Sequence, residues 1–310
     1  MNQQHSVLDR VLGGLMARYT ERVPDVRKIS DTMLAEKAIT TEEDIDNDHI
    51  AFRTMGVPHL GLQSLEKVFL HYGYERRDNY EFDVKKLNAY WYSPPSARYP
   101  RVFLSELKVG ELSEPTQRII KSYTDTVAED PVDQLDLDDP VAVDAFLHQP
   151  LWRTPTIADY NELATESEYA AWVIYNRYYL NHFTISVHNL PDDFNTVDKF
   201  NEFLQRHNVR LNDSGGIAKR SPDGLLIQSS TVAELVNADF DDGAGGVTQK
   251  MIPGSYVEFA ERLPLPQFSN LANADIRRAH RRDGFATANA DRIFESTFSH
   301  QTGKTANPGD

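Results

Sequence analysis

Apolar side chains recur at every third or fourth position in several stretches of the chain, and this spacing predicts amphipathic helices. These stretches cover residues 7–22, 26–37, 62–74, 113–127 and 196–209. The segment "SEYAAWVIYNRYYL" at 167–180 is apolar around most of its circumference, which predicts a helix that is buried on all sides.

Other stretches alternate between apolar and polar residues, which predicts strands. The clearest are "HIAFR" (49–53), "HFTISVH" (182–188) and "SYVEFAER" (255–262), and further extended segments are expected at 87–93, 101–109, 215–221 and 224–232. Since successive side chains of a strand point to opposite faces, each of the first three strands has one apolar and one polar face.

The order of these elements repeats along the chain. A strand that begins with histidine, a helix and then further strands occur at 49–109 and again at 182–263. We expect an α+β fold of paired βαβββ modules that form a curved, mostly antiparallel sheet; two unrelated α+β segments are the alternative. The expected single domain (1–310) comprises N-terminal helices (1–44), a first module (45–110), a helical connection (111–180), a second module (181–265) and a tail (266–310) whose residues 299–310 are frayed.

The polar faces of the three strands carry one potential metal ligand each: His49, His182 and Glu258. Two neutral imidazoles and one carboxylate, with positions left open, are the donor set of non-haem Fe(II) sites, and the same set can hold Zn(II) or Mn(II). The alternative is that these histidines are hydrogen-bonded core residues. Glu261 is the rival carboxylate, but in a regular strand it points away from the face that Glu258 occupies.

Arg53 shares the polar face of its strand with His49 and lies about 13 Å further along an extended chain. A guanidinium at that place can bind a carboxylate in bidentate fashion. The alternative is an ion pair with a neighbouring acid such as Glu106. The polar residues Ser105, Gln228, Ser229, Ser230 and Tyr256 are weaker candidates for the lining of a pocket.

Composition narrows the function further. The 310 residues include no cysteine, so disulfides, thiolate metal sites and cysteine nucleophiles are excluded. The net charge of -15 argues against nucleic-acid binding. The one basic cluster, "RRAHRR" at 277–282, is interpreted as a solvated helix face or as packing on local acids. Neither a leader peptide nor an apolar run of membrane-spanning length is evident, so we expect a cytoplasmic protein.

The segments "DHIAFRTMG", "NHFTISVH" and "GSYVEFAER", in this order and followed by "DGFATANADRIFEST", resemble the 2-oxoadipate dioxygenase/decarboxylase family of the vicinal-oxygen-chelate superfamily. That superfamily is built from paired βαβββ modules. The resemblance implies that His49, His182 and Glu258 hold Fe(II), with Zn, Ni or Mn as possible substitutes. It also implies that Arg53 anchors the distal carboxylate of the substrate.

The activity implied by the resemblance is the conversion of 2-oxoadipate, a lysine breakdown product, and dioxygen into 2-hydroxyglutarate and carbon dioxide. One rival is a glyoxalase-like isomerase, lyase or hydrolase that uses its metal as a Lewis acid and consumes no oxygen. Another is a protein that binds a small anion without converting it. The sequence leaves the oligomeric state and the preferred 2-oxo acid open.

Overall fold

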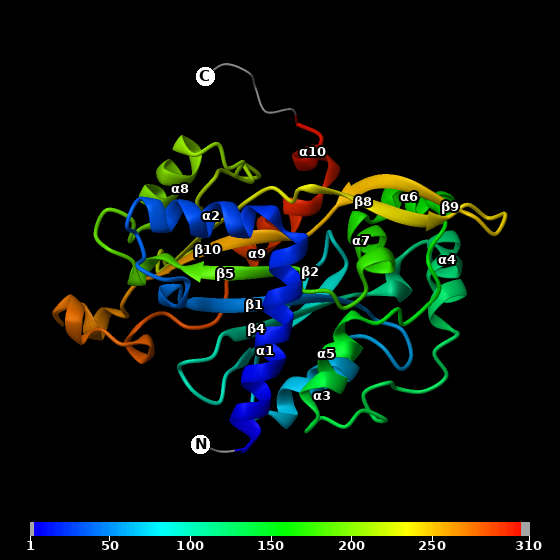
Figure 1. Ribbon diagram of the computed structural model, residues 1–310, viewed down its shortest axis with the longest axis horizontal. Helices are drawn as coiled ribbons and strands as arrows, with labels where there is room; N and C mark the ends of the chain where they lie inside the picture. The colour runs from blue at the N-terminus through cyan, green and yellow to red at the C-terminus, as the bar shows by residue number, and fades with distance from the viewer. Residues whose placement is uncertain (1–2, 305–310) are drawn as a thin grey trace.

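The core of the molecule is an eight-stranded sheet, seen in the computed structural model, which describes residues 3–304 (Figure 1). The order of the strands differs from their order in the chain. From one edge to the other the sheet contains β2 (Glu75–Phe82), β3 (Leu87–Ser93), β4 (Arg101–Leu107), β1 (Asn47–Met55), β5 (His182–Ser186), β10 (Tyr256–Arg262), β7 (Leu226–Ser230) and β6 (Lys219–Arg220).

The two halves of this sheet have the same topology. The first is β1, α3 (Leu62–His71), β2, β3 and β4, and the second is β5, α8 (Val197–Arg206), β6, β7 and β10. In each half the first strand pairs in parallel with the last, and all other pairs are antiparallel. The predicted α+β fold of paired βαβββ modules in a mostly antiparallel sheet is therefore confirmed.

The halves join where β1 and β5 pair in antiparallel orientation. Ala51 lies opposite His182 across this seam, and Tyr256 of β10 lies opposite His182 on the other side of β5. Three strands that are far apart in the sequence are thus adjacent. Side chains on their polar faces are brought together by the pairing alone.

The helices outside the two modules are α1 (Gln3–Arg22), α2 (Pro24–Ala35), α4 (Glu114–Thr124), α5 (Pro140–His148), α6 (Ile157–Glu166), α7 (Glu168–Asn176), α9 (Thr287–Ile293) and α10 (Ser299–Thr302). Several helices of the chain start with ordinary capping chemistry. Proline occupies one of the first two positions of α2, α4 and α5, and the side chains of Ser113 and Thr196 cap α4 and α8. In Figure 1, α1 crosses in front of the central strands and α2 lies along them, while α8, at the upper left, contacts β7 and β10.

The hollow of the sheet is occupied by the C-terminal segment. Helix α9 contacts β2 at one edge of the sheet and β6 at the other edge. The following turn η7 (Phe294–Thr297) is buried, and α10 continues from it. The prediction that 299–310 is frayed is wrong for Ser299–Thr302, which is helical, while residues 305–310 lie outside the described residues.

Several elements were not evident from the sequence. Strand β2 buries only Tyr80 and Phe82, so it lacks a regular apolar alternation. Strands β8 (Leu235–Asp241) and β9 (Val247–Pro253) form a separate hairpin between β7 and β10, and most of their side chains are not buried. Helix α7 ends four residues before the predicted end at 180, because Arg177 adopts a left-handed conformation with φ 55°.

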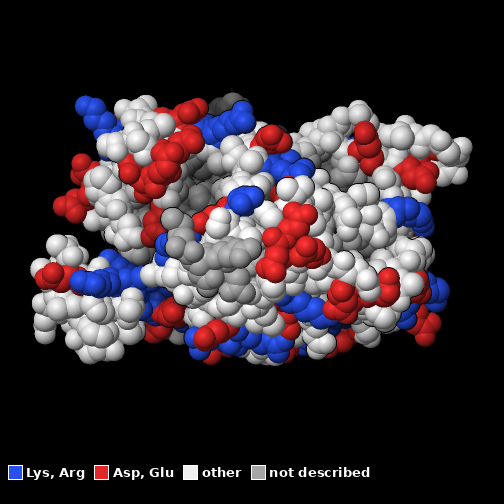
Figure 2. All heavy atoms as spheres, turned by 60° about the horizontal axis from the view of Figure 1, so that its bottom comes forward, with Lys and Arg blue, Asp and Glu red and all other residues white. Residues whose placement is uncertain are grey.

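The surface is polar and mixed in charge. Acidic and basic side chains are interspersed over the face in Figure 2, among many uncharged residues. Within residues 3–304, no helix combines the length and the apolar character that a membrane crossing requires.

Candidate metal centre

The side chains of His49, His182 and Glu258 meet on the polar face of β1, β5 and β10. The Nε2 atoms of the two imidazoles are 3.3 Å apart. One carboxylate oxygen of Glu258 lies 3.5 Å from His49 Nε2 and the other lies 3.1 Å from His182 Nε2. All three residues are buried. The structure therefore brings together the donor set that the sequence suggested.

The residue before each histidine sets the orientation of its ring. Asp48 Oδ2 lies 2.9 Å from His49 Nδ1, and Asn181 Oδ1 lies 3.1 Å from His182 Nδ1. Because carboxylate and amide oxygens can only accept, each Nδ1 carries the proton and donates. Each Nε2 atom is then left with a lone pair that faces the other two donors.

The site has the properties of a cation site. The hydroxyl of Thr184 can donate to His49 Nε2 at 3.1 Å, and Gln228 Nε2 donates to Glu258 at 2.6 Å. His182 Nε2 faces only lone pairs of its two neighbours, which is costly in a buried site unless a cation lies between them. Metal bonds of about 2.1 Å at octahedral or tetrahedral angles separate neighbouring donors by about 3.0–3.4 Å. The observed separations fit such an ion.

The Glu258 carboxyl is held in its charged form. Burial raises its pKa, but the adjacent imidazoles of His49 and His182 outweigh burial and hold that pKa well below the usual range. With a metal bound, the site would offer one negative charge and two neutral nitrogen donors. This combination favours a divalent cation.

Arg53 lies on the same strand and face as His49 and is fully buried without a counter-charge. Its Nη1 donates to Thr297 Oγ1 at 2.9 Å and its Nη2 donates to the Phe294 carbonyl at 3.0 Å, while Nε has no partner. No carboxylate within residues 3–304 forms an ion pair with it. The suggested pairing with Glu106 does not occur, because Glu106 accepts from the Leu62 amide at 2.7 Å.

A small cavity adjoins the three donors. Its volume is about 20 Å³, which leaves room for about one water molecule. The side of the cavity opposite the strands is formed by apolar residues of the C-terminal segment, Phe285, Ala290, Ile293 and Phe294. The ring of Phe285 also contacts His49 edge-on, with 4.8 Å between the ring centroids.

The model of the 2-oxoadipate dioxygenase/decarboxylase family matches residues 11–272 of this chain. The chain belongs to this family. Two family members are the 2-oxoadipate dioxygenase/decarboxylases of Arabidopsis thaliana and of Oryza sativa subsp. japonica. Both are 41% identical, over 302 and 301 residues, which cover 94% of this chain and 77% and 79% of the respective relative.

A solved structure of the family has the same fold. It is the hydroxyglutarate synthase from Oryza sativa in complex with 2-oxoadipate, which superposes with a TM-score of 0.89 at 40% identity and covers 98% of this chain and 96% of its own. The resemblance noted in the sequence is thereby confirmed.

The expected cytoplasmic location is wrong by the same comparison. The Arabidopsis relative is named as chloroplastic and the rice relative as chloroplastic/amyloplastic. The expectation rested on an N-terminal stretch without leader character. Such a stretch does not establish where a protein is located.

The other residues suggested as pocket lining take different places in this family member. Gln228 and Tyr256 line the small cavity, and the buried Tyr256 hydroxyl has no partner. Ser105 lies opposite Arg53 on β4 and bonds to Tyr169 at 2.9 Å. Ser230 lies opposite Glu258 on β7 but bonds to Ser296 at 2.8 Å and does not line the cavity.

Two groups of site residues were missed. Asp48 should point away from His49 in a regular strand, but the pairing of β1 with β5 shifts register between Asn47 and Ile50. The apolar residues of the C-terminal segment reach the cavity only through the folding of the whole chain. The motif "DGFATANADRIFEST" was the one signal that pointed to this segment.

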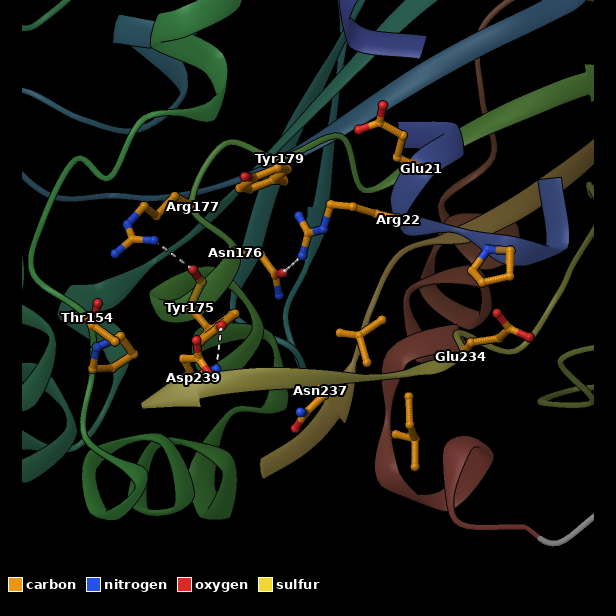
Figure 3. A pocket seen from close by; sticks show the side chains of 14 residues that line it. Glu21, Arg22, Thr154, Tyr175, Asn176, Arg177, Tyr179, Glu234, Asn237 and Asp239 are labelled. Carbon is orange, nitrogen blue, oxygen red and sulfur yellow. Dashed lines mark hydrogen bonds between the residues drawn. The ribbon is translucent and has the colours of Figure 1, made fainter. Parts of the chain in front are cut away.

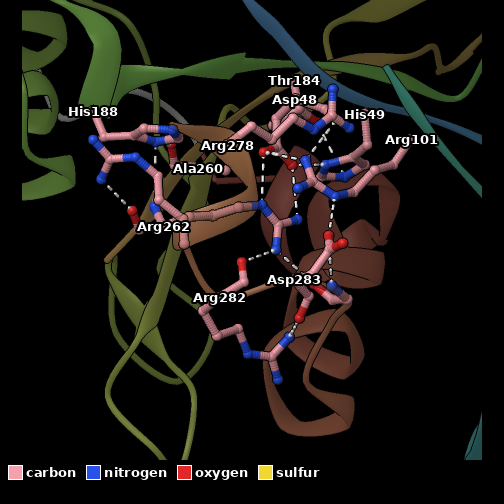
Figure 4. A network of polar contacts seen from close by, with 12 residues as sticks. Asp48, His49, Arg101, Thr184, His188, Ala260, Arg262, Arg278, Arg282 and Asp283 are labelled. Carbon is pink, nitrogen blue, oxygen red and sulfur yellow. Dashed lines mark hydrogen bonds and ion pairs between the residues drawn. The ribbon is translucent and has the colours of Figure 1, made fainter. Parts of the chain in front are cut away.

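Asp48 is the centre of a buried ionic network (Figure 4). Its carboxylate accepts from Arg262 Nε at 2.7 Å, from Arg262 Nη2 at 2.8 Å and from Arg101 Nη1 at 3.1 Å, besides His49. Burial raises the pKa of Asp48, but the two guanidinium groups outweigh it and hold that pKa well below the usual range. The group that orients His49 is therefore charged at neutral pH.

We expect Asp48→Asn to lower the free energy of unfolding by about 3–5 kcal/mol, because the buried Arg262 then lacks its carboxylate partner and Arg101 keeps only Asp283. Denaturant unfolding measures this loss. Asp283→Asn is the matched control: Asp283 pairs with the same Arg101 at 2.5 Å, but its side chain is 58% exposed, so we expect a loss below about 1 kcal/mol. Equal losses in the two variants would contradict the role assigned to Asp48.

A wider cavity lies away from the three donors, between the end of α1, the end of α7 and β8 (Figure 3). Its volume is about 610 Å³. Arg22 donates to Asn176 Oδ1 at 2.9 Å and stacks on the ring of Tyr179, while Arg177 donates to the Trp152 carbonyl at 2.8 Å. None of the candidate metal ligands lines this cavity, so its size does not make it the reaction site.

Proposed function

We propose that this chain is an Fe(II)-dependent dioxygenase that converts 2-oxoadipate into 2-hydroxyglutarate and carbon dioxide. Family membership and the rice structure with 2-oxoadipate support the substrate. The observation that carries the proposal is that three metal donors converge and that a buried arginine without a carboxylate partner lies on the same strand as one of them. One molecule of 2-oxoadipate and one of dioxygen account for all atoms of the two products.

His49, His182 and Glu258 would hold the metal, whose chemistry when bound is to take up the 2-oxo acid and dioxygen at open positions and to carry the oxidation. The three strands supply donors from one side only, which leaves the cavity side free for the substrate. The apolar wall of Phe285, Ile293 and Phe294 excludes bulk water from that side.

Arg53 would bind the distal carboxylate of the substrate. The guanidinium is charged although burial lowers its pKa, and it has no acidic partner in the protein. A carboxylate would satisfy its Nε and replace the two neutral acceptors that it now has. This contact would fix the chain of the substrate and would select diacids over monoacids.

The cavity must widen before a six-carbon diacid can enter, because its volume of about 20 Å³ holds about one water. Phe285, Ala290, Ile293 and Phe294 form the wall that is not part of the sheet. We expect this C-terminal segment, rather than the paired strands, to shift when the substrate binds.

Oxygen uptake tests the proposal. Protein prepared without oxygen and loaded with Fe(II) should consume one dioxygen for each carbon dioxide released from 2-oxoadipate. Protein loaded with Zn(II) should consume none, since zinc has no redox chemistry. Loss of 2-oxoadipate without oxygen uptake would instead indicate Lewis-acid chemistry, and tight binding without conversion would indicate a binding protein. Either result would refute the dioxygenase.

A further inference from the structure

The basic cluster "RRAHRR" packs on an acid at Arg282, whose Nε lies 3.3 Å from Asp223 Oδ2. It forms a short turn, η6 (Arg278–His280), and the strand-like residues after it. Arg278 Nη1 donates to the carbonyls of Ala97 at 2.8 Å and Tyr99 at 2.7 Å, and Arg281 Nη1 donates to the Arg262 carbonyl at 2.7 Å. Among the described residues, neither Arg278 nor Arg281 forms an ion pair with a carboxylate.

These two arginines line a narrow pocket together with Arg101, Arg262 and His188, and we call this the arginine pocket. Its volume is about 40 Å³. Two carboxylates, Asp46 and Asp48, also line it, and Asp283 pairs with Arg101 from outside the pocket, so four guanidinium groups face three acids. A local excess of positive charge is unusual in a protein whose net charge is -15.

The pocket contains a buried hydrogen-bond donor that the protein does not satisfy. Arg278 Nη2 is buried and has no partner. His188 Nδ1 lies 3.2 Å from the Arg262 amide nitrogen and 3.4 Å from the Ala260 carbonyl oxygen. Burial lowers the pKa of His188 to about 4, which keeps the ring neutral at pH 7.

We propose that the arginine pocket binds a small oxyanion of the carboxylate or phosphate type. Partly buried guanidinium groups are costly without counter-charge, and an anion would supply an acceptor for the unpartnered Arg278 Nη2. The volume admits a small ion and excludes a long chain. No residue of the arginine pocket lines the cavity beside the candidate metal ligands, because the Asp48–His49 pair separates the two spaces. The site is thus additional to the one assigned to 2-oxoadipate.

Titration calorimetry of the metal-loaded protein with inorganic phosphate and with acetate tests this site, with chloride at equal ionic strength as reference. At least one oxyanion should bind more tightly than chloride. A preference for phosphate would indicate a phosphate-type ligand, and a preference for acetate a carboxylate. If neither phosphate nor acetate binds more tightly than chloride, the proposal is refuted.

Variants locate the binding. Arg281→Gln and Arg278→Gln should each weaken the preferred oxyanion by about 10- to 100-fold, because each removes a charge-assisted contact. Arg277→Gln is the matched control: Arg277 belongs to the same cluster but is exposed and does not line the pocket, so its variant should bind as the wild type does. Binding that survives in the first two variants and disappears in Glu258→Gln would place the ion at the metal centre and would also refute the site.

Discussion

Glu258→Gln is expected to weaken Fe(II) binding by more than about 100-fold and to reduce oxygen uptake with 2-oxoadipate to background. The amide removes the single negative charge among the three donors and presents one oxygen where the carboxylate presents two. Loss of a hydrogen-bonding partner around a metal site typically costs about 10- to 100-fold in affinity, and loss of a ligand should cost more. Metal content after dialysis and oxygen uptake measure the two effects.

Glu261→Gln is the matched control for this change. Glu261 lies three residues further along the same strand and is also buried, but it accepts from the Val197 amide at 2.9 Å at the start of α8. An amide oxygen can accept that hydrogen bond equally well, so metal content and oxygen uptake should stay near those of the wild type. Retention of Fe(II) by Glu258→Gln, or equal loss in both variants, would exclude Glu258 as the ligand.

Arg53→Met is expected to lower kcat/KM for 2-oxoadipate by about 30- to 1000-fold, which corresponds to the loss of a desolvated contact between a charged pair. Methionine keeps most of the volume and apolar character of the side chain between Tyr169 and Trp172. Steady-state oxygen uptake over a range of substrate concentrations measures the change. Fe(II) content should not fall, because Arg53 contacts none of the three donors.

A second substrate separates recognition from general damage to the fold. 2-Oxohexanoate has the same chain length as 2-oxoadipate but ends in a methyl group. The wild type should prefer the diacid strongly, and Arg53→Met should lose that preference while its activity on the monoacid changes little. If the activities on both acids fell in parallel, Arg53 would have only a structural role.

The candidate site could be predicted from the sequence because strand parity is a local property. From residue 49 to 55, β1 pairs with β4 without a break, so His49 and Arg53 share a face as the alternation in "HIAFR" implies. The same parity separated Glu258 from Glu261 on β10. The alternation did not predict the position of Asp48. It assigns the Asp48 side chain to the face opposite His49, but the shift in register turns this side chain toward His49.

The remaining parts of the fold depend on contacts between distant segments. The exposed side chains of β2, β8 and β9 leave no apolar face for alternation to reveal, since these strands are stabilised mainly by their partners. Nothing local indicates that α9 reaches both edges of the sheet, or that Phe285 contacts His49 across 236 positions. Such placements follow from the closure of the whole sheet.

The hydrogen bonds from Arg53 to Phe294 and Thr297 hold the C-terminal segment in the hollow of the sheet. A ligand could displace this segment only if it supplied an acceptor strong enough to replace both of these hydrogen bonds. If Arg53 binds the distal carboxylate as proposed, a diacid would supply this acceptor with its far end, whereas a monoacid would have to displace the segment and leave the guanidinium without an acceptor. Part of the discrimination between the two acids would then come from contacts within the protein itself.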